Sequence, residues 1–182
     1  MMRWVTILFL LCACSSLSDK KLPEVFVETT DTALHNVNGC WIWKGEKFNG
    51  FILEKNKKVL LAKLPVSCGL ENGTAVSWFT NGHKKYEKYL VAGKREGIQK
   101  GWYANGTLAF IHFFAKDKFE GEQKTFYESG HPWQNLNYIN GYEDGKQNSW
   151  SDSGRVVNNF TVKNGKLYGV IGRFDCMSVY KK

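Results

Sequence analysis

Residues 95–118 read REGIQKGWYANGTLAFIHFFAKDK, and residues 119–142 read FEGEQKTFYESGHPWQNLNYINGY. Both stretches have a glycine in third place, an aromatic residue five positions later and a second glycine nine positions later. A fixed period of this kind is the signature of a repeat architecture. The two stretches therefore indicate tandem copies of one small structural unit.

The same spacing continues along the chain in both directions. Successive opening glycines stand 24 residues apart, and the aromatic position keeps the same step. The opening glycines are Gly73, Gly97, Gly121, Gly145 and Gly169, and the aromatic position holds Trp78, Trp102, Phe126, Trp150 and Phe174. A ring that recurs at one repeat position is typical of the stacked core of an array, so we interpret these rings as a ladder between repeats.

Turn and strand signals predict the structure of each unit. Asn81-Gly82 and Asn105-Gly106 suit tight hairpin turns, because glycine accepts the positive φ that such turns require. Between the turns lie short runs rich in aromatic and branched residues, such as LAFIHFF at 108–114, and no stretch combines a helical period with capping signals. The sequence therefore predicts an all-β fold, an elongated single-sheet array of tandem 24-residue β-hairpin repeats with N- and C-terminal caps.

The pattern Gly-x-x-x-x-aromatic-aromatic-x-x-Gly, often preceded by glutamate, resembles the MORN (membrane occupation and recognition nexus) repeat. More closely, it resembles the bacterial MORN-repeat variant proteins that are labelled YwqK-like antitoxins, and GIQKGWYANG at 97–106 fits best. The resemblance covers about residues 70–175. It implies a curved sheet of successive hairpins and roles in phospholipid binding, protein scaffolding or toxin neutralisation.

The N-terminal segment predicts export and lipid anchoring. Residues 1–13 combine one positive charge with an apolar run that is too short to span a bilayer, as signal peptides do. Leu11-Cys12-Ala13-Cys14 resembles the bacterial lipobox, which implies cleavage before Cys14 and lipidation of that cysteine. We expect residues 14–38 to form the lipidated tether and the chain to lie in the bacterial cell envelope, with Ser15 favouring the outer membrane over the inner. An ordinary secretory peptide is the alternative.

The remaining chain divides into two predicted parts. Residues 39–72 are expected to form an N-terminal capping hairpin segment, and residues 73–182 to contain the repeats and a C-terminal cap. Cys40 and Cys68 both lie in this capping segment, and an oxidising compartment would allow them to form a disulfide. Two buried free thiols are the alternative interpretation.

Charge gives the main indication of function. Lys and Arg number 25 and Asp and Glu number 17, so the formal net charge is +8. Basic residues interleaved with aromatic residues suit an anionic partner, because cations attract its charge and rings stack or insert. The candidate binding surface is Lys84, Lys85, Tyr86, Lys88, Tyr89, Lys94, Arg95 and Lys100. A solvated face that keeps the protein soluble is the alternative.

No motif in the sequence predicts an enzyme. His83 and His131 share one repeat position but lie two repeats apart, roughly 19 Å in a regular stack, so they cannot ligate one metal. Zinc-type Cys/His spacing, a phosphate loop and a dinucleotide fingerprint are all lacking. Glutamates at the repeat boundaries are interpreted as turn and ion-pair residues. We therefore expect no catalytic residue, metal site or cofactor.

These patterns favour a non-enzymatic envelope lipoprotein whose repeat surface binds a partner protein or an anionic membrane lipid. Export makes nucleic acid a poor candidate partner. One alternative is a YwqK-like antitoxin that neutralises a toxin, although a signal peptide argues against a cytosolic target. The other alternative is a glycan- or cell-wall-binding module that uses exposed aromatic rings.

Overall fold

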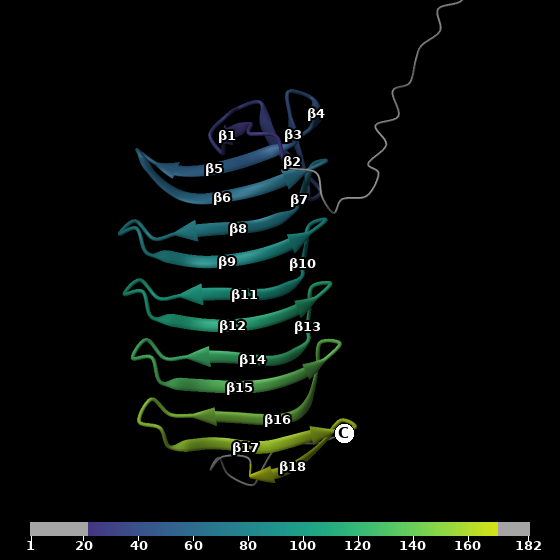
Figure 1. Ribbon diagram of the computed structural model, residues 1–182. Coiled ribbons are helices and arrows are strands. Elements are labelled where there is room, and N and C mark those ends of the chain that lie inside the picture. The colour runs from purple at the N-terminus through teal and green to yellow at the C-terminus, as the bar shows by residue number, and fades with distance from the viewer. Residues whose placement is uncertain (1–21, 171–182) are drawn as a thin grey trace, which may run out of the picture.

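The computed structural model describes residues 22–170. The predicted signal peptide, Cys14, Phe174 and nearly all of the predicted C-terminal cap therefore lie outside the described residues. Within the described range the chain is all-β and forms one large, mostly antiparallel sheet of stacked hairpins, which confirms the predicted fold class (Figure 1). Among these residues, no helix is long and apolar enough to cross a membrane.

The large sheet contains 15 strands, and its hairpins follow one another in chain order. Its N-terminal part consists of β1 (Phe26–Glu28), β5 (Gly50–Asn56), β6 (Val59–Ser67) and β7 (Leu70–Glu71). The first two repeats supply β8 (Gly73–Trp78), β9 (Lys84–Val91), β10 (Lys94–Arg95), β11 (Gly97–Trp102), β12 (Leu108–Ala115) and β13 (Lys118–Phe119). The later repeats supply β14 (Gly121–Phe126), β15 (Pro132–Ile139), β16 (Tyr142–Trp150), β17 (Val156–Lys163) and β18 (Lys166–Val170).

The glycine period has a backbone cause. All five opening glycines have a positive φ, from 64° at Gly97 to 118° at Gly169. A residue with a Cβ is strained in this region, whereas glycine adopts it freely. The period in the sequence therefore marks the point where each chain segment leaves a turn and enters the next hairpin.

A separate three-stranded sheet forms a cap over one end of the large sheet. It consists of β2 (Leu34–Val37), β3 (Cys40–Trp43) and β4 (Glu46–Lys47). The core under it contains the buried side chains of Val27, Phe48, Ile52 and Val66, which are at most 4% exposed. The first two strands, β1 and β2, come from residues 26–37, which the sequence assigned to the tether. The cap region is thus built from the small sheet and from the first hairpin of the large one.

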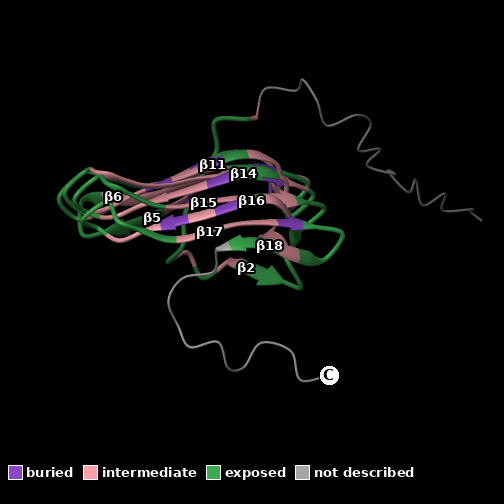
Figure 2. Cartoon of the chain, turned by 90° about the horizontal axis from the view of Figure 1, so that it is seen from below, coloured by how far each residue is buried: buried purple, intermediate pink, exposed green. Residues whose placement is uncertain are grey.

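We name the two faces of the large sheet from this contact. The cap face carries Ile52 and Leu64, which pair across β5 and β6, and the open face is the opposite one. Side chains alternate between faces along a strand, and the strand register places Ser77 and Tyr86 on the cap face. Buried segments recur from strand to strand in Figure 2, in the middle of the sheet, while the turns at both edges are exposed.

The predicted disulfide between Cys40 and Cys68 is wrong. Cys68 is disulfide-bonded, whereas Cys40 is a free cysteine. The Cys40 sulfur packs against Gly69, where an added Cβ would lie only 2.5 Å from it. The Cys40 thiol therefore fills the space at the glycine of the β6–β7 turn and does not bond to the cysteine beside it.

Candidate binding surface

A row of buried glutamines joins successive repeats. Gln99, Gln123 and Gln147 stand 24 residues apart on the cap face, and their exposed fractions are 2%, 3% and 0%. For Gln99 and Gln123 this link supplements a short backbone pairing between neighbouring hairpins. The β9–β11 ladder contains only Lys100↔Glu87 and Gly101↔Tyr86, and β12–β14 is equally brief.

Gln123 shows how the side-chain amide replaces the missing ladder. Its Oε1 accepts a hydrogen bond from the backbone N–H of Phe113 at 3.0 Å. Its Nε2 donates to the carbonyl of Phe113 at 3.0 Å and to that of Glu120 at 2.9 Å. Gln147 makes the same two-way contact with the backbone of Asn137. Gln123 and Gln147 thus pair with the preceding hairpin as a backbone peptide group would, and Gln99 makes the donor half of this contact to the carbonyl of Tyr89.

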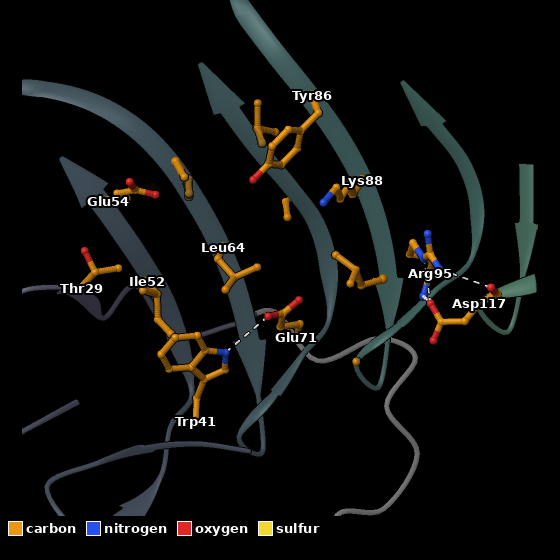
Figure 3. A pocket seen from close by; sticks show the side chains of 16 residues that line it. Thr29, Trp41, Ile52, Glu54, Leu64, Glu71, Tyr86, Lys88, Arg95 and Asp117 are labelled. Atoms are coloured by element: carbon orange, nitrogen blue, oxygen red, sulfur yellow. Dashed lines mark hydrogen bonds and ion pairs between the residues drawn. The ribbon is translucent and has the colours of Figure 1, made fainter. Parts of the chain in front are cut away.

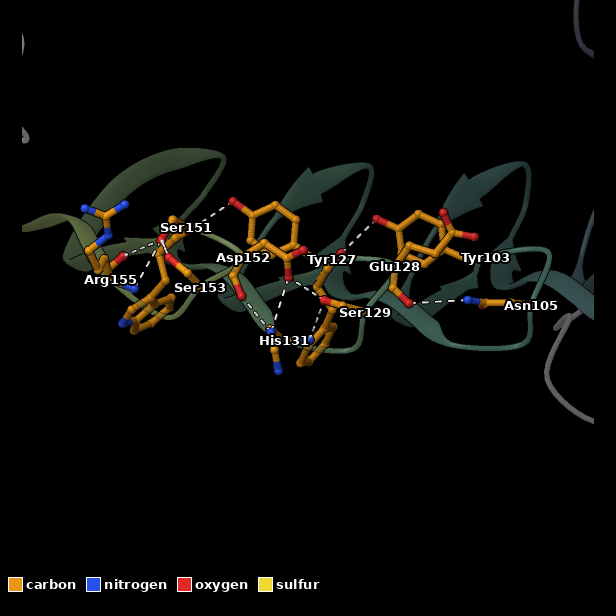
Figure 4. Close-up of polar contacts among 12 residues, drawn as sticks. Tyr103, Asn105, Tyr127, Glu128, Ser129, His131, Ser151, Asp152, Ser153 and Arg155 are labelled. Atoms are coloured by element: carbon orange, nitrogen blue, oxygen red, sulfur yellow. Dashed lines mark hydrogen bonds and ion pairs between the residues drawn. The ribbon is translucent and has the colours of Figure 1, made fainter.

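The hairpin turns are bonded to one another along one edge of the sheet (Figure 4). The hydroxyls of Tyr103 and Tyr127 donate to the carbonyls of Phe126 and Trp150 in the following repeat, at 2.8 and 2.9 Å. Nδ1 of His131 lies 2.7 Å from the carbonyl of Asp152. In Tyr103 and Tyr127, the second aromatic position of the repeat therefore stabilises the stack through its hydroxyl.

The opposite edge uses the glutamates that precede the opening glycines. Glu96 Oε2 accepts from the backbone N–H of Lys116 at 2.9 Å, and Glu120 Oε2 accepts from that of Asn140 at 2.8 Å. Each carboxylate therefore bonds a turn of the next hairpin. These contacts account for the glutamates structurally, without an acid or base role.

The four described members of the aromatic ladder are half-buried at the ends of β8, β11, β14 and β16. Trp102 carries the Nζ of Lys84 over its ring at 5.3 Å from the centroid. Lys84 also forms an ion pair with Glu87 at 2.7 Å. At Trp102 the ladder therefore brings a ring and a lysine together on the open face.

The structure divides the predicted binding surface between the two faces. Tyr86 and Lys88 lie on the cap face, and Arg95 stays near them, with its guanidinium 4.1 Å above the Phe114 ring. Lys84, Tyr89 and Lys100 lie on the open face, where Lys100 pairs with Glu87 in the strand register. Lys85 lies near the ring of Phe79, and Lys94 is exposed at the start of β10. The eight residues therefore do not form one continuous patch.

The open face carries a group of exposed apolar side chains among these lysines. Tyr89, Ile98 and Phe113 are 45%, 54% and 40% exposed. Ile98 pairs with Phe113 in the strand register, and the next pair along the same two strands, on the same face, is Lys100 with Ile111. Ile98 and Phe113 could not be selected from the sequence, because only the strand register places them beside Tyr89 and Lys100. Exposed apolar residues gathered beside cations indicate a contact surface.

Local electrostatics differ between the faces. On the cap face, burial and, less strongly, the Arg95 charge lower the pKa of His112. Arg95 also donates to Asp117 at 2.9 Å, and this bond lowers the pKa of the Asp117 carboxyl. On the open face, hydrogen bonds from Lys124 and Asn135 lower the pKa of Glu122. In residues 22–170, no group of three His, Cys, Asp or Glu side chains could hold a metal ion.

Comparison with known families agrees with this architecture. The family model described as the MORN repeat variant matches residues 95–116 and 119–140. These two matches fall on the adjacent hairpins β11–β12 and β14–β15. No curated protein matches the chain.

Proposed function

Because the chain carries MORN repeat variants, which are generally binding or scaffold modules, we propose that it is a non-enzymatic, lipid-anchored envelope protein whose open face binds an anionic partner. The observation that supports this is the mixture of Tyr89, Ile98 and Phe113 with Lys84 and Lys100 on one face. The residues that hold the repeats together bond to backbone groups of the next or preceding hairpin, so the exposed rings and apolar side chains of the open face are not needed for these bonds between repeats.

An anionic membrane surface is the partner that this chemistry suits best. Cations near an anionic bilayer contribute about 1 kcal/mol each, and rings insert at the interface. Lipidation at Cys14 would hold the face close to phospholipid headgroups. The binding energy would then come from charge and apolar insertion together, and added salt would weaken it.

Vesicle binding of the full chain tests the open face. Lys84→Glu combined with Lys100→Glu removes two cations, so binding to phosphatidylglycerol-containing vesicles is expected to fall by at least about thirtyfold. Lys88→Glu is the matched control, since Lys88 lies on the cap face of the same strand. Equal losses in both variants, or equal binding to neutral phosphatidylcholine vesicles, would refute a role for the open face in lipid binding and direct attention to an acidic protein partner.

Fatty-acid labelling tests the anchor separately. The wild-type chain expressed in a bacterial host is expected to incorporate labelled fatty acid and to fractionate with membranes, whereas Cys14→Ala should do neither. An unlabelled cytosolic wild type would contradict the lipoprotein proposal. That result would favour the alternative in which the array neutralises a toxin.

A further inference from the structure

A hollow of about 480 Å³ lies on the cap face where the cap meets the first repeat. Its volume is within the range of small-ligand sites. Ile52, Leu64 and Ala75 form an apolar floor, and Trp41 from the cap closes one side (Figure 3). The hollow contains none of the open-face residues Lys84, Tyr89, Ile98, Lys100 and Phe113, so it is independent of the proposed function.

The hollow exists at this junction because the first repeat departs from the glutamine pattern. Ala75 occupies the repeat position that Gln99, Gln123 and Gln147 hold in the three following repeats. Those glutamines fold into the gap between neighbouring hairpins and fill it. The short alanine side chain leaves the corresponding volume in the floor open.

Unpaired charges of opposite sign stand at opposite sides of the floor. Glu54 lies on β5, and Lys88 lies on β9 with its Nζ 4.2 Å from the centroid of the Tyr86 ring. Within residues 22–170 neither side chain forms an ion pair, and in Figure 3 they flank Leu64 from opposite sides. Arg95, by contrast, is already paired with Asp117. The hollow therefore presents an anionic end, an apolar middle and a cationic end.

The distance across the hollow defines the size of a matching ligand. Glu54, Ala62, Ser77 and Tyr86 are register partners on four adjacent strands, so roughly 14 Å of sheet separates β5 from β9. Side chains that reach inward from both ends shorten this span. Two or three extended residues, at about 3.3–3.6 Å each, cover what remains.

We propose that this hollow binds a short zwitterionic peptide, with its free amino group at Glu54, its carboxylate at Lys88 and an apolar side chain on the floor. Charge complementarity supports a dipolar ligand over a purely anionic one, since Glu54 and Glu71 also face the hollow. The Tyr86 ring lies beside Lys88, and its hydroxyl, which points into the hollow in Figure 3, is a further hydrogen-bond donor for the ligand.

Calorimetry of the full chain with the tripeptide Ala-Leu-Ala tests the proposal. The peptide with two free termini is expected to bind, and N-acetylation or C-amidation should each weaken binding by about tenfold, the effect of one lost charge-assisted hydrogen bond. Lys88→Met should weaken binding of the free-acid peptide but leave binding of the amidated peptide unchanged. That difference would not arise if Lys88 were merely structural.

Ala75→Gln provides a second variant that restores the repeat pattern and fills the floor. It should abolish peptide binding while leaving the β-sheet circular dichroism and vesicle binding intact. Peptide binding that is unaffected by Ala75→Gln, or by capping of both termini, would overturn the proposal. So would an absence of peptide binding in a chain that binds the neutral trisaccharide maltotriose.

Discussion

Replacing the buried Gln123 with alanine should destabilise the array of repeats. Gln123 is 3% exposed, and its amide makes bonds of 3.0, 3.0 and 2.9 Å to backbone groups. A neutral hydrogen bond contributes about 1 kcal/mol net, and leaving a buried backbone donor without a partner costs about 1–3 kcal/mol. The backbone N–H of Phe113 becomes such a donor, so the expected total loss is about 2–4 kcal/mol.

Urea unfolding followed by circular dichroism gives the loss in stability, and amide hydrogen exchange gives its location. Exchange is the sharper measurement, because repeats contact only their neighbours and can open separately. The Phe113 amide should exchange faster in Gln123→Ala. Gln99→Ala is the matched control and should cost less, because Gln99 only donates and its Oε1 has no partner among the described residues. An unchanged Phe113 exchange rate, with a loss below about 0.5 kcal/mol, would refute the role assigned to these glutamines.

Three further predictions concern single groups. Tyr127→Phe removes the 2.9 Å bond to the Trp150 carbonyl and should lower the free energy of unfolding by about 1 kcal/mol in urea, whereas a loss near zero would mean that the hydroxyl contributes nothing. The pKa of His112 is lowered by burial and by Arg95, so the unfolded chain binds a proton more readily than the folded chain. The free energy of unfolding should therefore fall as pH drops below about 6.5. His112→Phe should flatten this part of the plot of unfolding free energy against pH, whereas His83→Asn should not. Alkylation of the denatured, unreduced chain should label Cys40 and leave Cys68 unlabelled until a reductant is added; prior labelling of Cys68 would contradict its disulfide.

The repeat unit could be predicted from the sequence because its turns depend on particular residue types at fixed positions in the chain. Gly97 and its equivalents need a positive φ, and the asparagine-glycine pairs need tight turns, so both requirements are written at fixed positions in the chain. The glutamines were equally periodic, as Gly-x-Gln at 97–99, 121–123 and 145–147. They were missed because a buried polar side chain has meaning only when the gap that it fills is known.

The candidate site was harder to predict, since it depends on the faces of strands. Lys84, Lys88 and Lys100 are close together in the sequence, yet Lys88 lies on the opposite face from the other two. One residue of register moves a side chain to the other side of a sheet. The hairpins β8–β9, β11–β12, β14–β15 and β16–β17 each contain a register shift near the turn, such as that between Ser77 and Trp78. The Cys40–Cys68 pairing failed for a related reason. Cys40 packs against Gly69, the neighbour of Cys68 in the chain, yet Cys40 is a free cysteine.

The first repeat gives a way to separate stacking residues from binding residues in such an array. A residue that keeps the period and bonds to the next or preceding hairpin, as Tyr127 and Gln123 do, is explained by the stack. In the first repeat two of these positions change, to Ala75 and Phe79, and each change removes a polar group that bonds between repeats elsewhere. Loss of such a hydrogen bond lowers the stability of the stack by about 1 kcal/mol or more, and no other stacking contact replaces it. Ala75 borders the hollow, which is where a ligand would compensate for the lost contact.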